Sequence, residues 1–121
     1  MRQYSLPKVS LLTKSWQYNH VYKQGKRIRA KGVTFVYTPN TRGHNRLGIS
    51  VSGMKSAVKR NRIKRLVREF YRFHPMFPSA LAGAKENQTG FDLVVATNNR
   101  FVPKGLGHLK TIFLSFLPPL A

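Results

Sequence analysis

Residues 46–73 read RLGISVSGMKSAVKRNRIKRLVREFYRF and join a period-two segment to a helical one. Over 46–52 every second side chain is apolar, which predicts a half-buried strand. From about Ser56 to Phe73 apolar residues recur at helical spacing, with Ile63, Leu66, Val67 and Phe70 on one stripe. His74-Pro75 follows and ends this helix. The stretch therefore predicts a sheet strand followed by a long amphipathic helix.

The face of this helix opposite the apolar stripe is cationic. It carries Asn61, Lys64, Arg65, Arg68 and Arg72, is flanked by Arg62, and has Lys59 and Arg60 near the helix start. Like charges four residues apart cost roughly 0.2–0.5 kcal/mol per pair, and cations at a helix N-terminus oppose its dipole. We interpret the face as a phosphate-binding surface, and a solvated face is the alternative. Asn61 could read a base edge or ribose hydroxyl, or could bond to a neighbouring turn.

Hydrophobic periodicity and turn residues predict the remaining elements. In chain order we expect a loose segment 1–10, a helix 13–24 capped by Thr13 or Ser15 and stopped by Gly25, a short strand 26–29, a strand 33–38, the strand 46–52, the helix 56–73, a loop 79–90, a strand 91–97 and a helix 103–117. Turn residues at 39–45 predict a hairpin between the strands 33–38 and 46–52. Together these elements predict an α/β (α+β) two-layer sandwich. We expect it to form a single RNA-binding domain over residues 1–121.

Composition narrows the partner class. The chain has 121 residues, 41% of them hydrophobic, with 22 Lys and Arg against 3 Asp and Glu, for a net charge of +19. A folded domain this basic repels itself unless a polyanion lies against it, and nucleic acid is the commonest. There is no cysteine, which excludes disulfides and cysteine zinc sites. We find no signal peptide or membrane span, and we expect a cytoplasmic protein with no membrane partner.

The strand RLGISVS (46–52) and the helix AVKRNRIKRLVRE (57–69) together resemble the signature of the bacterial ribonuclease P protein family. Weaker similarity covers the first helix and the strands around 35–37 and 91–95. Two departures stand out. Residues 53–56, after the strand, are one residue shorter than usual, and Leu11-Leu12 stands where the family usually has Arg-Leu at the opening of the first helix. The first departure leaves any RNA contact from this loop in question.

The resemblance implies an α/β sandwich with a left-handed βαβ crossover and a function in tRNA 5′ maturation. The partners it implies are the ribonuclease P RNA and precursor tRNA, and no protein oligomer is required. It places the basic helix against the catalytic RNA and the single-stranded 5′ leader in a central cleft. The predicted RNA-binding residues are Arg46, Lys59, Arg60, Asn61, Arg62, Lys64, Arg65, Arg68 and Arg72. The predicted cleft residues are Tyr18, Tyr22 and Tyr37, which could instead be amphipathic core residues.

The chain lacks a pattern for catalysis of its own. Hydrolysis of a phosphodiester with Mg²⁺ usually needs clustered carboxylates, but Glu69, Glu86 and Asp92 fall on a helix, a loop and a strand. The four histidines are scattered. We therefore predict no catalytic or metal-binding residues, and we expect Mg²⁺ to be held mainly by RNA phosphates.

Two other classes compete with this interpretation. A small basic ribosomal protein would have the same size and charge, but the RNR helix after an RLG strand argues against it. A helix-turn-helix DNA binder needs a second short helix before the basic one, and here a strand precedes it.

Overall fold

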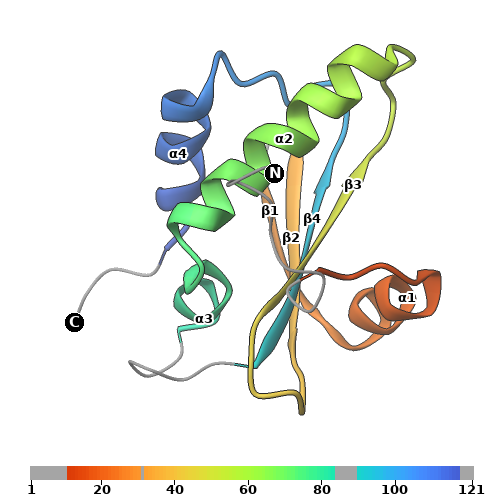
Figure 1. Cartoon of the computed structure of the whole chain (residues 1–121), viewed down its shortest axis with the longest axis vertical. Helices are drawn as coiled ribbons and strands as arrows, with labels where there is room; N and C mark the ends of the chain where they lie inside the picture. Colours follow the sequence, from red (N-terminus) through yellow and green to blue (C-terminus); the bar gives the residue numbers. More distant parts are fainter. Residues whose placement is uncertain (1–10, 31, 84–89, 118–121) are drawn as a thin grey trace, which may run out of the picture.

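The computed structural model describes residues 11–30, 32–83 and 90–117. In chain order the elements are α1 (Ser15–Gln24), β1 (Lys26–Ala30), β2 (Val33–Pro39), β3 (Arg46–Val51), α2 (Ala57–Phe73), α3 (Phe77–Leu81), β4 (Phe91–Thr97) and α4 (Leu106–Leu114) (Figure 1). The predicted loose segment 1–10 lies outside the described residues. The predicted α/β sandwich is confirmed.

The four strands form one sheet in the order β1-β2-β4-β3. β2 pairs antiparallel with β1 and with β4, whereas β3 pairs parallel with β4. The connection from β3 to β4 runs through α2 and α3, so it is a βαβ crossover. The left hand of this crossover stays a prediction.

The predicted hairpin between β2 and β3 is wrong. β4 lies between these two strands, and residues 40–45 connect strands that do not pair. The hairpin is formed by β1 and β2, where Gly32 adopts φ +82° and a Cβ would lie 2.7 Å from the Phe101 nitrogen. Turn residues at 39–45 predicted a change of direction correctly, but they could not specify which strand would be the neighbour.

Helices cover both faces of the sheet. The larger core contains Phe35, Leu93 and Val95 from the sheet, together with apolar side chains of α2, α3 and α4. On the other face Val36 and Val94 pack with Leu12 and Val21 under α1, which lies apart from the other helices (Figure 1). The alternation of side chains along a strand explains how β2 and β4 serve both clusters. α1 thus adds a small third layer to the predicted two.

Several element ends differ from prediction. α1 is capped by Lys14, and the Gln17 side chain accepts from the backbone nitrogens of Thr13 and Lys14 at 2.8 and 2.9 Å. The predicted loop 79–90 begins inside α3, whose Phe77 and Leu81 are buried in the larger core. α4 (Leu106–Leu114) is shorter than the predicted helix 103–117, and the carbonyls of Pro103 and Lys104 before it accept from Arg62.

Arg46 lies inside the fold. Its Nε and Nη2 donate to the two carboxylate oxygens of Asp92 at 2.8 and 2.7 Å, and both side chains are buried. The hydrogen bond to Asp92 raises the pKa of Arg46 above its ordinary value, although burial opposes this. The prediction that Arg46 contacts RNA needs correction, because its charge is neutralised within the protein.

Asn45 joins three segments beside this ion pair. Its Nδ2 donates to the Pro75 carbonyl at 3.2 Å and to Ser79 Oγ at 3.1 Å. Its Oδ1 accepts from the backbone nitrogens of Gly90 and Phe91 at 3.0 and 2.9 Å. The buried amide therefore ties the end of α2 and the start of β4 to the residue before β3.

We expect Asn45→Ala to lower the free energy of unfolding by about 1–3 kcal/mol, because it leaves buried backbone donors unpaired. Urea denaturation followed by circular dichroism measures the change. Asn19→Ala, at an exposed position on α1, is the matched control and is expected to stay within about 0.5 kcal/mol of the parent. Equal stability of the two variants would contradict the bracing role.

Tyr71, on the buried stripe of α2, should make the protein sensitive to alkali. Burial, and secondarily the charge of Asp92, raises the pKa of Tyr71 from 10.0 to about 12. The unfolded chain loses this proton first, so the stability contribution is complete below about pH 10 and is lost as pH rises towards 12 and beyond. Parent and Tyr71→Phe proteins should differ in their pH dependence by roughly 2–3 kcal/mol across this window. Parallel loss of stability in both would refute the assignment.

Candidate nucleic-acid interface

α2 buries one stripe and exposes the opposite one. Its buried residues are Ile63, Leu66, Val67, Phe70 and Tyr71. The helix begins where Ser56 Oγ accepts from the Lys59 backbone nitrogen at 3.3 Å. The packing of the buried stripe fixes the rotation of α2 about its axis. It therefore also fixes the direction in which the cationic side chains point.

The outward face holds most of the predicted RNA-binding residues. Asn61, Arg65 and Arg68 are exposed, and Lys64 and Arg72 are half-buried. The Arg72 guanidinium lies 4.2 Å from the centroid of the Phe73 ring. Within the described residues no carboxylate lies within ion-pair distance of Arg65 or Arg68. We call Asn61, Lys64, Arg65, Arg68 and Arg72 the outward basic face.

Arg60 and Arg62 lie near the start of α2 and on the flank of the cationic face, as predicted, and their guanidiniums contact protein carbonyls. Arg60 Nη1 donates to the carbonyls of Met54 and Lys55 at 2.7 and 3.0 Å. Arg62 donates to the carbonyls of Pro103 and Lys104 at 3.0 and 2.9 Å. Both guanidiniums therefore hold flanking segments against the N-terminal half of α2. Each keeps its charge, because a carbonyl does not neutralise it.

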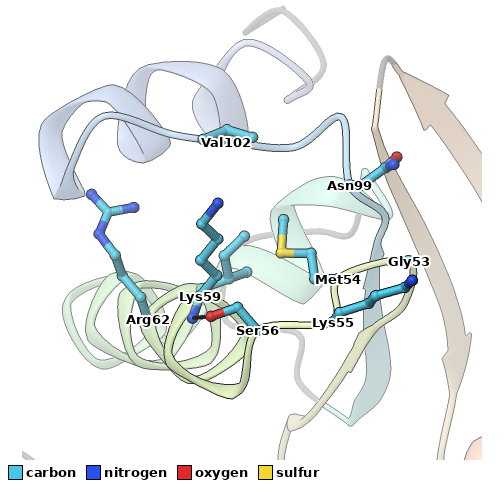
Figure 2. Close-up of a pocket in the computed structure, with 9 residues that line it drawn as sticks. Gly53, Met54, Lys55, Ser56, Lys59, Arg62, Asn99 and Val102 are labelled. Atoms are coloured by element: carbon cyan, nitrogen blue, oxygen red, sulfur yellow. Dashed lines mark hydrogen bonds between the residues drawn. The ribbon is translucent and has the colours of Figure 1, made fainter.

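A pocket of about 530 Å³ opens between these two braced segments. The loop before α2 supplies Met54 and Lys55, the helix supplies Lys59 and Arg62, and the segment after β4 supplies Val102. In Figure 2 the Lys59 amino group rises from the helix towards the Val102 segment, and the Met54 thioether projects into the same pocket from the loop before α2. The shortened loop 53–56 thus forms a wall of this pocket.

The structure does not bring the three predicted cleft tyrosines together. Tyr18 and Tyr22 are half-buried against the smaller apolar cluster under α1. Tyr37 packs against the larger core on the other face of the sheet. The Tyr18 hydroxyl accepts from the Ile49 nitrogen at 3.2 Å and donates to the Leu12 carbonyl at 3.4 Å, which orients its ring. Any shared surface on α1 therefore involves Tyr18 and Tyr22 without Tyr37.

The described residues contain no group of three His, Cys, Asp or Glu side chains that could hold a metal ion. Of the two described acids, Asp92 is engaged by Arg46 and by Asn40 Nδ2, and Glu69 stands on α2. His74 stacks on Phe70, and His108 Nδ1 accepts from the Lys104 nitrogen. These donors do not fit a protein-held metal.

In the described part of the chain no helix is long and apolar enough to cross a membrane.

Comparison with known proteins identifies a family that this chain matches. A family model described as ribonuclease P matches residues 6–105. The ribonuclease P protein component of Desulfotalea psychrophila is 48% identical over 80 residues, covering 64% of this chain and 67% of the relative. That of a Thermoanaerobacter species is 32% identical over 104 residues, covering 85% and 82%.

Solved structures agree with the sequence relatives. The ribonuclease P protein of Staphylococcus aureus superposes with a TM-score of 0.60 at 29% identity, covering 73% of each chain. The protein of Thermotoga maritima gives 0.61 at 24% identity, covering 83% of this chain and 87% of that one, and so supports the fold alone.

A four-stranded sheet that presents one long cationic helix has the features expected of an RNA-binding protein subunit. The chain belongs to the ribonuclease P protein family, as the resemblance over 46–69 predicted. The alternative of a ribosomal protein is not supported.

Proposed function

We propose that this chain binds the ribonuclease P RNA through the outward basic face of α2, and so assists removal of the 5′ leader from precursor tRNA. The observation that carries the proposal is the exposure of Arg65 and Arg68 on a packed helix, with no described carboxylate within ion-pair distance of either guanidinium. Arginine suits this surface because its planar guanidinium donates two parallel hydrogen bonds to a phosphate.

The two partners contact different parts of the protein in this proposal. The RNA subunit lies along α2. The single-stranded leader lies near α1, where the rings of Tyr18 and Tyr22 are half-exposed and could contact unpaired bases. Stacking of a base on an aromatic ring is worth roughly 1–3 kcal/mol. The position of Tyr37 on the other face argues against its sharing that contact.

The protein's own part is to bind and position RNA. Mg²⁺ is held mainly by RNA phosphates in this proposal, because the described carboxylates do not converge. The cationic face would lower the repulsion between two polyanions, which matters most when little Mg²⁺ is available to screen them.

A cleavage assay with precursor tRNA at low Mg²⁺ tests the proposal. The reactions contain the protein alone, a bacterial ribonuclease P RNA alone, or both. We expect cleavage at the mature 5′ end to be strongly stimulated in the mixture and absent with the protein alone. Stimulation should shrink at high Mg²⁺. An unchanged rate on adding the protein at low Mg²⁺ would refute it.

A further inference from the structure

We propose that the pocket between residues 53–56 and the segment 98–104 binds one unpaired nucleotide of the RNA partner. Its base would lie against Met54 and Val102, and its phosphate against Lys59. This inference rests on the proposed function in taking RNA as the partner, and it adds a subsite separate from the outward basic face.

The pocket walls are braced from both sides. Arg60 ties the loop before α2 to the helix through the Met54 and Lys55 carbonyls. Arg62 ties the helix to the opposite wall through the Pro103 and Lys104 carbonyls. Because these protein hydrogen bonds hold both walls in place, binding need not order them. Its volume of about 530 Å³ is typical of small-molecule pockets.

Part of the apolar lining of the pocket is exposed in the described part of the chain. Val102 is 66% exposed although it lies between buried Phe101 and Pro103. Met54 projects into the pocket (Figure 2), and Ile63 of α2 is a further apolar lining residue. A flat nucleobase covers such a surface, and a thioether makes favourable contact with an aromatic ring. An apolar group left open within so basic a region indicates an occupant with both an apolar and an anionic part.

The charge around the pocket has one sign. Lys59 is exposed, and Figure 2 shows its amino group directed over the cavity. Lys55 and Arg62 add positive charge at two other points of the lining, and no carboxylate is among the lining residues. An anionic group is therefore favoured at the rim next to the apolar surface.

An RNA nucleotide explains the combination of an apolar surface and surrounding cations better than a fatty-acid anion does. Arg62 lies one helical turn from Arg65, so a strand bound along the outward basic face could continue into the pocket. An unpaired nucleotide supplies a flat base and a phosphate together. A fatty anion would need a long apolar channel, whereas this lining places cations at several points around a short apolar surface.

Titration of the full chain with adenosine 5′-monophosphate, followed by amide chemical shifts, tests the pocket. We expect shifts concentrated in residues 53–59 and 99–102. Adenosine and inorganic phosphate should each bind at least about tenfold more weakly than the nucleotide, because each supplies half of the contacts. Octanoate should also bind more weakly. Phosphate or octanoate equal to the nucleotide would overturn the proposal.

The variant Val102→Glu places a carboxylate in the pocket and should weaken nucleotide binding at least about tenfold. Thr111→Glu, at an exposed site on α4, adds the same charge to a residue of similar shape and should change binding less than about twofold. Lys59→Gln provides a second variant if Val102→Glu fails to fold. Unchanged binding in the pocket variants, or shifts confined to residues 64–72, would refute this subsite and leave the proposed function standing. Loss of RNA binding in the outward-face variants described below tests that function separately.

Discussion

Replacing Asp92 with alanine is expected to lower the free energy of unfolding by about 3–5 kcal/mol. Both carboxylate oxygens accept from Arg46, and Oδ1 also accepts from Asn40 Nδ2 at 2.7 Å. The Asp92 side chain is 2% exposed and that of Arg46 10%, so water cannot easily replace the lost partner. The change leaves a buried guanidinium unpaired, and its desolvation is then no longer offset. Urea denaturation of the purified protein measures the loss.

The control for this experiment is Glu69→Ala, which removes the same charge from a half-buried position on α2. It is expected to change stability by no more than about 0.5 kcal/mol. Replacing both partners, as Arg46→Met with Asp92→Leu, should recover part of the loss because neither charge then stays buried alone. The structural role is refuted if Asp92→Ala is no more damaging than Glu69→Ala.

The double variant Arg65→Ala and Arg68→Ala is expected to weaken binding of the ribonuclease P RNA by roughly 10–100-fold near 0.1 M salt. When an arginine that contacts a phosphate is removed, fewer counterions are released from the RNA on binding. The plot of log affinity against log salt should therefore flatten by roughly 1.4–1.8 in slope for the pair. Filter binding over a series of salt concentrations measures both quantities.

A matched pair, Arg29→Ala and Arg42→Ala, separates a local effect from the loss of net charge. Both residues are exposed and lie away from α2, on β1 and in the segment after β2. Their removal lowers the total charge equally and should reduce the affinity by no more than a few-fold. The outward basic face is not the RNA-binding surface if both double variants give the same salt slope.

Local sequence patterns specified where the long helix and the last strand begin and end, whereas the order of the strands depended on distant contacts. The helix over 56–73 and the strand over 91–97 were predicted to within a residue, because strong periodicity and the neighbouring prolines or glycines specify them locally. The neighbour of β3 was predicted wrongly. β4 inserts beside β3 from more than 40 residues away, and no local pattern records that register.

In the candidate site, too, some features follow from local sequence and others from distant contacts. The outward direction of Asn61, Arg65 and Arg68 follows from the wheel of α2 alone. The engagement of Arg46 by Asp92, and of Arg62 by the Pro103 and Lys104 carbonyls, depends on partners 41–46 residues away. For the same reason the pocket beside Val102 had no signal in the sequence, where an exposed valine looks like a buried one.

The amino-acid sequence alone determined the class of partner, the family and the cationic face of the long helix. Net charge, periodicity and a local motif are properties of short stretches, and they survive without any knowledge of distant contacts. Tertiary structure alone decided which cations remain available. Burial and long-range hydrogen bonds sort chemically identical arginines into one that neutralises an interior carboxylate, two that brace a pocket, and others that face solvent.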